Sequence, residues 1–158
     1  PNPPTHPQTH LHTHTNMSEP TPTIHAAFIR EHLNEHLLGS EVLPLFNTGR
    51  IVITNGLQDR FGEQTLDLVA ELLTAHSCCY WGNALPAGDW QSNDDPGNIE
   101  RFERLPSEHG KDYEPRALHI PGRVLASWRF PKESESVWVI TESGDNGFVT
   151  TVLLPSEY

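Results

Sequence analysis

Apolar residues recur at helical spacing in the segment 63–76. Leu66, Val69, Leu72 and Leu73 follow one another at intervals of three, three and one residues, with acidic residues at the intervening positions. Such spacing places apolar side chains on one face of a helix and carboxylates on the other. The pattern therefore predicts an amphipathic helix that ends at about residue 76.

The segment 23–38 is predicted to form an earlier helix. Thr23 stands where an N-cap residue is expected, because its hydroxyl can accept a hydrogen bond from the first turn. Good helix formers follow, and Gly39 comes directly after the segment, at a position where helices commonly end. The residues in between are less clearly divided into apolar and polar faces than those of 63–76.

The C-terminal third has the pattern of β-strands. Apolar and polar residues alternate in 123–130, as expected of a half-buried strand, whereas 136–141 is apolar on both faces, as expected of a central one. A third run covers 147–154. The connections 131–135 and 143–147 are short enough for hairpins, so the three strands should form an antiparallel meander.

A short strand is also predicted at 50–54, between turn-forming residues at Gly49 and at Asn55 and Gly56. Together these elements predict an α+β fold. Two or three helices should pack on one face of a small antiparallel β-meander of three to four strands.

The chain is long enough for one domain with a modest core, which we assign to 23–158. Residues 1–22 are rich in Pro and His and predict a disordered tail. Residues 77–121 are rich in turn-forming residues and are expected to be irregular, with one short helical turn at 99–104. Within them, about 94–121 has the character of an insertion.

The formal net charge is −11, from 21 acidic and 10 basic residues. This excess of acid disfavours a phosphate-binding surface, so direct DNA binding is not expected and a protein partner is the expected one. No apolar stretch has the length of a membrane span, and we expect no membrane association. Cys78 and Cys79 are adjacent and cannot close a stabilising loop, which favours a cytoplasmic protein.

Possible metal sites are weak. The segment HLNEH, 32–36, has the H-x-x-E-H pattern, in which His32 and His36 would ligate zinc while Glu35 acts as a base. The pattern is short and a third ligand is not identified, so a solvated helix face rich in His is the preferred interpretation. His76 and the two cysteines lack the paired spacings of a structural zinc site. We therefore expect no cofactor.

Several motifs nevertheless resemble a family of small uncharacterised bacterial proteins that are common on plasmids and other mobile elements. The segments YWGNALPAGDWQSND, GRVLASWRF, VWVITE and TTVLLPSEY resemble the family's G-D-W-G, G-x-R-L-L-S-A-Y and W-I-I-T-E…T-T-I-L-L-P-E-D-Y motifs. The resemblance covers roughly 45–95 and 122–158. The shared residues are His76, Trp81, Gly82, Asp89, Asn93, Arg123, Ser127, Trp138, Thr141, Glu142, Thr150, Thr151, Pro155, Glu157 and Tyr158.

This resemblance implies no established activity. The family's D-R-S after the shared Glu is replaced here by SGDNG, which removes an Arg suited to binding phosphate or carboxylate. The sequence leaves two functional hypotheses and one purely structural interpretation. In the structural interpretation the four tryptophans are core residues and the shared polar residues cap turns.

The first hypothesis is a non-enzymatic interaction or regulatory protein of a mobile element. It would bind a host or defence protein, and in a narrower version it would imitate a nucleic acid through its carboxylates. The residues expected at such a binding site are Trp81, Asp89, Asn93, Arg123 and Glu142.

The second hypothesis is a small ribonuclease toxin similar to RelE and barnase. His76 would serve as general acid or base, and the other residues near the scissile phosphate would be Thr141, Glu142, Thr151 and Tyr158. The scarcity of basic residues argues against this hypothesis, because such enzymes must hold RNA. Both hypotheses depend on whether these side chains meet in space.

Overall fold

The computed structural model describes residues 23–39, 44, 46–94 and 123–158. The disordered tail predicted at 1–22 lies outside these ranges, as do the helical turn predicted at 99–104 and almost all of the insertion at 94–121. In chain order the elements are α1 (Ile24–Leu37), β1 (Arg50–Ile53), α2 (Asn55–Phe61), η1 (Gly62–Gln64), α3 (Thr65–Ser77), α4 (Ala87–Asp94), β2 (Arg123–Trp128), β3 (Val137–Gly144), β4 (Gly147–Leu153) and η2 (Pro155–Glu157).

The strands form a single four-stranded sheet in the order β1-β4-β3-β2. β2, β3 and β4 are joined by antiparallel pairings, which confirms the predicted meander and the central place of β3. β1 is added beside β4 in parallel, with Arg50 opposite Val149 and Ile53 opposite Val152. The sheet is therefore mixed rather than wholly antiparallel. The elements between β1 and β4 provide the long connection that a parallel pair requires.

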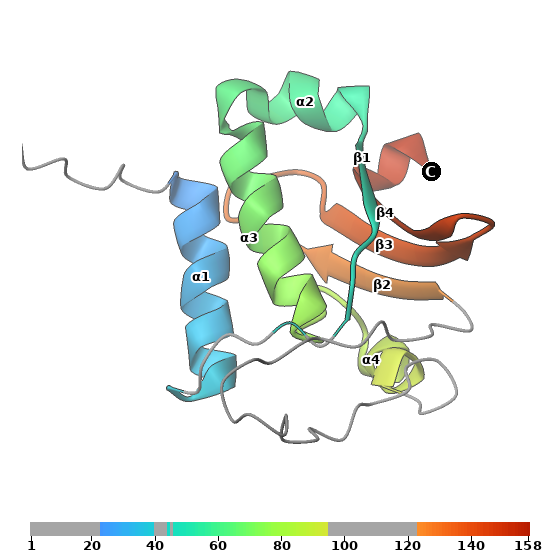
Figure 1. Cartoon of the computed structure of the whole chain (residues 1–158). Coiled ribbons are helices and arrows are strands. Elements are labelled where there is room, and N and C mark those ends of the chain that lie inside the picture. Colours follow the sequence, from blue (N-terminus) through green and yellow to red (C-terminus); the bar gives the residue numbers. More distant parts are fainter. Residues whose placement is uncertain (1–22, 40–43, 45, 95–122) are drawn as a thin grey trace, which may run out of the picture.

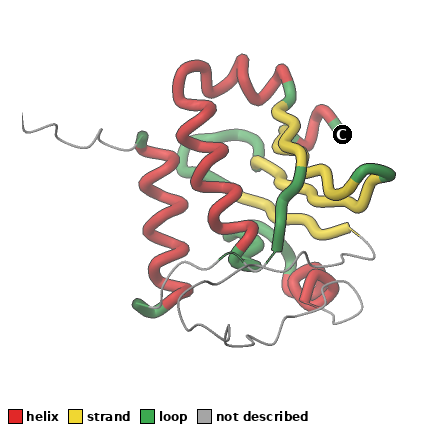
Figure 2. The backbone as a smooth tube through the Cα atoms, in the orientation of Figure 1, coloured by secondary structure: helices red, strands yellow, loops and turns green. Residues whose placement is uncertain are grey.

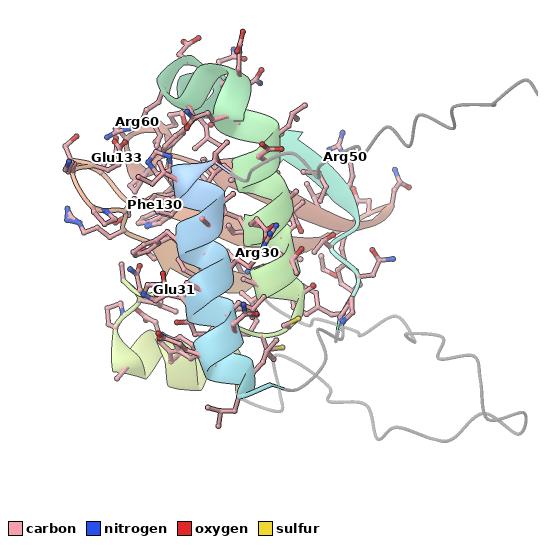
Figure 3. All side chains as sticks on the ribbon, turned by 90° about the vertical axis from the view of Figure 1, so that its left-hand side faces the viewer. Arg30, Glu31, Arg50, Arg60, Phe130 and Glu133 are labelled. Carbon is pink, nitrogen blue, oxygen red and sulfur yellow. The ribbon has the colours of Figure 1, made fainter. Side chains whose placement is uncertain are left out.

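The fold class is α+β, as the sequence predicts. α1 and α3 lie side by side on one face of the sheet, with α2 leading from β1 into α3 (Figures 1 and 2). In the view of Figure 3 these helices stand in front of the strands. Within the described part of the chain, no α-helix covers the opposite face of the sheet, and none is both long and apolar enough to cross a membrane.

The core lies between the helical layer and the sheet. α1 contributes Ile29 and Leu33, and α3 contributes Leu68 and Leu72, all of which are buried. The predicted apolar face of α3 needs one correction, because Leu66 is 73% exposed. The buried face of the helix runs through Thr65, Leu68 and Leu72 at helical spacing, and Leu66 lies off this face.

α1 has the predicted start. The hydroxyl of Thr23 accepts a hydrogen bond from the Ala26 backbone N–H at 3.3 Å, which confirms the expected N-cap. The helix ends with Leu38 in the left-handed region at φ 50°, and Gly39 follows at φ 80°. The Gly that the sequence places at the helix end therefore continues the left-handed turn that stops it.

α2 corrects the turn predicted at Asn55 and Gly56. A helix begins at Asn55 because the carboxylate of Glu157 accepts a hydrogen bond from the Gly56 backbone N–H at 2.7 Å. Thr54, the N-cap residue, makes no side-chain bond to the helix itself. The cap is thus supplied from the other end of the chain, which local sequence patterns cannot reveal.

α4 also falls within a segment predicted to be irregular. Pro86 precedes the helix, and its carbonyl accepts hydrogen bonds from the N–H groups of Asp89 and Trp90. The Trp90 ring packs edge-on against Tyr80 at 5.6 Å between ring centroids. This tertiary contact gives a polar eight-residue helix an apolar anchor.

The segment Trp81 to Ala84 lies along the outer edge of β2. Ser127 donates its N–H to the Trp81 carbonyl and accepts at its own carbonyl from Ala84 N–H, each at 3.0 Å. Gly82 makes this approach possible, because its φ is +89° and an added Cβ would lie 2.1 Å from the Ser127 carbonyl oxygen. Part of an otherwise open strand edge is protected in this way.

We expect Gly82→Ala to lower the free energy of unfolding by about 3 kcal/mol or more, since it combines left-handed strain with a collision against backbone. The matched control is Gly39→Ala, where φ is +80° and nothing lies within 4 Å of the added Cβ. That variant should show the cost of the backbone conformation alone, about 1 kcal/mol. Urea unfolding measures both; equal losses would contradict the proposed close approach.

Candidate functional site

His76, the residue around which the ribonuclease hypothesis was built, is completely buried near the end of α3. Its Nε2 lies 2.9 Å from the Thr141 hydroxyl on β3, which lies 2.7 Å from the Thr150 hydroxyl on β4. Thr150 donates in turn to the carbonyl of Thr48 at 2.6 Å, just before β1. A chain of hydrogen bonds thus connects α3, two central strands and the entry to the parallel strand.

The carbonyl at the end of this chain sets the direction of every proton in it. The Thr48 carbonyl can only accept, so the Thr150 hydroxyl donates its single hydrogen to that carbonyl. Thr150 must then accept the hydrogen bond from Thr141. Thr141 then has no proton for the imidazole and accepts from Nε2–H of His76. Nε2 of the ring therefore carries a hydrogen, and in the neutral ring Nδ1 then carries the lone pair.

The surroundings of the imidazole keep it neutral. The rings of Phe46 and Trp81 pack edge-on against it, with centroid distances of 5.4 and 5.2 Å. Nδ1 is buried and has no hydrogen-bond partner within the described structure. Burial lowers the pKa of His76 from 6.5 to about 3, because the charged form loses its hydration. A general acid or base is most effective when its pKa is near the working pH, and the pKa of His76 is far below neutral pH.

The structure does not bring the other ribonuclease candidates to His76, apart from Thr141. Neighbouring residues of a strand point to opposite faces, so Glu142 lies on the face away from the helices and is exposed. Thr151 is likewise on the face opposite to that of Thr150. Tyr158 is 71% exposed and packs against Trp138, which lies on the same outer face as Glu142. The five candidates are thus divided between the two sides of the sheet.

The outer side of the sheet holds a cluster of three exposed side chains around the half-buried Trp138 instead. The Tyr158 ring packs at 66° to that of Trp138, with 5.8 Å between centroids. The Arg123 guanidinium lies over the Tyr158 ring at 5.5 Å and donates a hydrogen bond to its hydroxyl. Glu142 is opposite Arg123 in the β2–β3 pairing, and its carboxylate Oε1 lies 4.0 Å from Nη1 of Arg123. We call Arg123, Trp138, Glu142 and Tyr158 the outer cluster.

Hydrogen bonds hold the chain segment that carries Tyr158. The Glu157 carboxylate accepts from the Thr54 hydroxyl at 2.5 Å, from Gly56 N–H at 2.7 Å and from Leu154 N–H at 3.0 Å. These bonds, that of Thr54 foremost, lower the pKa of Glu157 below its ordinary value. Glu135 accepts from the Ser156 N–H at 2.6 Å. The exposed tyrosine is therefore attached to a fixed backbone.

The residues predicted to bind a partner have different surroundings. Arg123 and Glu142 meet in the outer cluster, whereas Trp81 is a fully buried core residue. Asp89 is exposed on α4, and Asn93 lies in the same helix with a side chain outside the described part. In the purely structural interpretation Trp138 is one of four core tryptophans. The available signal that it lies on the outer face was the polar Glu142 four positions along the strand, because an even separation keeps two strand residues on one face.

The histidines of the H-x-x-E-H pattern make separate contacts. Nδ1 of His32 is 3.0 Å from the Phe28 carbonyl, and its ring packs against Phe28 and Trp128. His36 is exposed and packs on Tyr80 at 4.7 Å. Among the described residues, no group of three or more His, Cys, Asp or Glu side chains is arranged to hold a metal ion.

No family model, curated protein or solved structure matches this chain. The resemblance to the family of mobile-element proteins thus stays a prediction from its motifs, and the geometry of the side chains is the basis for the functional argument.

The low pKa of His76 predicts a specific loss of stability in acid. The unfolded chain binds a proton at His76 below about pH 6.5, whereas the folded chain does so only near pH 3. The free energy of unfolding therefore keeps its full value with respect to His76 above pH 6.5 and decreases as the pH falls below it. It should fall by about 5 kcal/mol in total as the pH drops through this window. Urea unfolding between pH 7 and pH 4 measures the slope.

His76→Gln should remove this part of the pH dependence, because glutamine can still donate to Thr141 but does not titrate. His36→Gln makes the same substitution at an exposed position of α1 and is the matched control. If the wild type and His76→Gln lost the same stability between pH 7 and pH 4, that result would contradict a buried, neutral His76.

Proposed function

We propose that this protein is a non-enzymatic interaction domain that binds a protein partner through the outer cluster on its sheet. Following the motif resemblance, we further propose that it belongs to a plasmid or other mobile element and that its partner is a host or defence protein. The observation that carries the proposal is an exposed Tyr158, whose ring packs edge-on against Trp138 and lies under the Arg123 guanidinium, on a side of the sheet with no described α-helix.

The composition of the outer cluster supports a protein interface. Trp, Tyr and Arg are the residues that most often dominate binding energy when a partner covers them. Here one of each is present within a single contact network, with Glu142 beside Arg123. An aromatic ring that is 71% exposed in the isolated chain contributes little to folding, but would bury apolar area on association.

The outer cluster is also fixed in advance. Glu157 attaches the last turn to the start of α2, and Glu135 attaches it to the β2–β3 connection. Side chains that are already ordered lose less conformational entropy on binding, so a rigid aromatic anchor binds more tightly than a mobile one. This organisation has no evident use in the core, because the anchored ring lies outside it.

The charge of the chain indicates the chemistry of the partner. With a net charge of −11, the protein should be attracted to a surface that carries basic residues. Glu142 is exposed next to the aromatic rings and can pair with such a residue. We therefore expect a partner segment that covers Tyr158 and Trp138 with an apolar side chain and places Lys or Arg near Glu142.

The alternative of a small ribonuclease has less support from this geometry. Its acid–base residue, His76, is buried and donates to Thr141, while Glu142 and Tyr158 lie on the other side of the sheet. The narrower proposal of a nucleic-acid mimic would use other residues, such as the exposed Glu31, Glu35 and Asp67 of the helical layer. It would therefore be insensitive to changes in the outer cluster.

The test is a pull-down from bacterial lysate followed by measurement of the affinity of the purified partner. Tyr158→Ala should weaken binding by about tenfold or more, as expected for an interface hot spot. Glu142→Gln should slow association and reduce its dependence on salt. Leu38→Ala, which alters an 89% exposed apolar residue of the helical layer, is the matched control and should bind normally.

All three variants should unfold at the same urea concentration as the wild type, so a change in affinity reports on the interface. Equal affinity of the Tyr158 variant and the wild type would contradict the proposal. So would captured material that consists of RNA and disappears after nuclease treatment.

A further inference from the structure

A second surface feature lies on the helical side of the molecule, where the β2–β3 connection passes the first half of α1. An open hollow of about 660 Å³ is formed there by Phe28 of α1, by Asn83 and Ala84, and by the segment from Arg129 to Glu133. Figure 3 shows Phe130 and Glu133 on this side, beside α1. The volume is within the usual range of small-molecule sites, about 300–1,000 Å³.

The floor of the hollow is apolar. The rings of Phe28 and Phe130 meet edge to face with 5.6 Å between centroids, and Pro131 and Ala84 extend the apolar lining. Phe130 is buried beneath the surface, while Phe28 is half-buried and presents part of its ring. An apolar group placed here would bury area against two aromatic rings.

Two cations lie at the rim. Arg129 and Lys132 are both exposed, and within the described part of the chain neither has a carboxylate partner. By contrast, Arg30, Arg60 and Arg123 are each paired with a glutamate. The Arg129 guanidinium donates one hydrogen bond to the Ser134 carbonyl at 3.3 Å, an acceptor that does not neutralise its charge.

The remaining polar groups of the hollow are already engaged. The Asn83 side chain accepts from Arg129 N–H at 2.8 Å and donates to the Arg129 carbonyl at 2.9 Å, which fixes the backbone that carries the guanidinium. The Glu133 carboxylate accepts from Arg60 and lies 3.4 Å from His25. Its charge is therefore compensated from outside the hollow, and the net charge facing a ligand is positive.

Lys132 is held in a strained backbone conformation. Its φ is +66°, and the N–H of Glu133 donates to the Phe130 carbonyl at 3.2 Å, so residues 130–133 form a turn with Pro131 second and Lys132 third. Turns with Pro in the second place and a left-handed third residue favour Gly or Asn at that third place. A lysine there is a poor choice for stability, and such outliers are a reason to look for a binding role.

We propose that this hollow binds a small organic anion with an apolar body, namely a carboxylate carried on an aromatic or aliphatic group. The apolar body lies on Phe28 and Phe130, and the carboxylate is bound between Arg129 and Lys132. The proposal is independent of the protein interface proposed above, since none of its residues belongs to the outer cluster.

The full chain should be titrated at neutral pH with phenylacetate, with the uncharged phenylacetamide and with inorganic phosphate, using amide chemical shifts as the readout. Phenylacetate should bind at a single saturable site and about tenfold more tightly than phenylacetamide, since charge-assisted hydrogen bonds are the stronger ones. Phosphate, which lacks an apolar body, should bind more weakly still.

Variants make the test specific. Arg129→Gln combined with Lys132→Asn should weaken phenylacetate binding by about tenfold or more. Lys132→Asn alone should bind less tightly while unfolding at the same or a higher urea concentration, because asparagine tolerates the left-handed conformation. Arg50→Gln, at an exposed position on β1 outside the hollow, is the matched control and should leave binding within about twofold.

Equal binding of phenylacetate and phenylacetamide would overturn the proposal, as would unchanged affinity in the double variant. Tight binding of phosphate would also overturn it, since the site would then recognise any anion. A loss of affinity in Arg50→Gln equal to that of the double variant would show attraction by overall charge only.

Discussion

The hydrogen-bond chain from His76 to the carbonyl of Thr48 is the interaction on which the rest of the structure depends. It passes through Thr141 and Thr150 and so fastens the end of α3 to the two central strands and to the chain that enters β1. The three side chains are buried, and leaving one of their polar groups without a partner would cost about 1–3 kcal/mol. The parallel strand and the helical layer are therefore positioned by the same set of bonds.

This arrangement decides which surfaces can serve recognition. The inner face of the sheet is occupied by helices and by a neutral histidine, so the polar and aromatic residues at the end of the chain lie on the outer face. Glu157 connects the two sides, because it caps α2 and also holds the turn that carries Tyr158. A rigid framework with its exposed aromatic residues in fixed places is suited to binding, and both proposed sites are built on this framework.

Much of the fold could be predicted from the sequence, since periodicity identifies α1, α3 and the three-stranded meander. The start of α2 could not, because its capping group comes from Glu157, about 100 residues away in the chain. The parallel place of β1 beside β4 likewise depends on contacts between the two ends of the domain. For the site, spacing alone puts His76 on the helix face of Val69 and Leu72, which indicates burial. The meeting of Arg123 with Tyr158 depends instead on strand register and on the final turn, which a sequence pattern does not determine.

The most direct test of this account is the protonation state of His76, measured by two-bond proton–nitrogen correlation NMR on the ¹⁵N-labelled protein. Proton counting along the chain predicts a hydrogen on Nε2. Burial with no partner for Nδ1 predicts a neutral ring with a bare Nδ1, unchanged between about pH 8 and about pH 4. A hydrogen on Nδ1, or a titration near the ordinary value of 6.5, would contradict it. His76 would then be accessible to protons, and the buried chain could not be what holds the helices, the sheet and the parallel strand together.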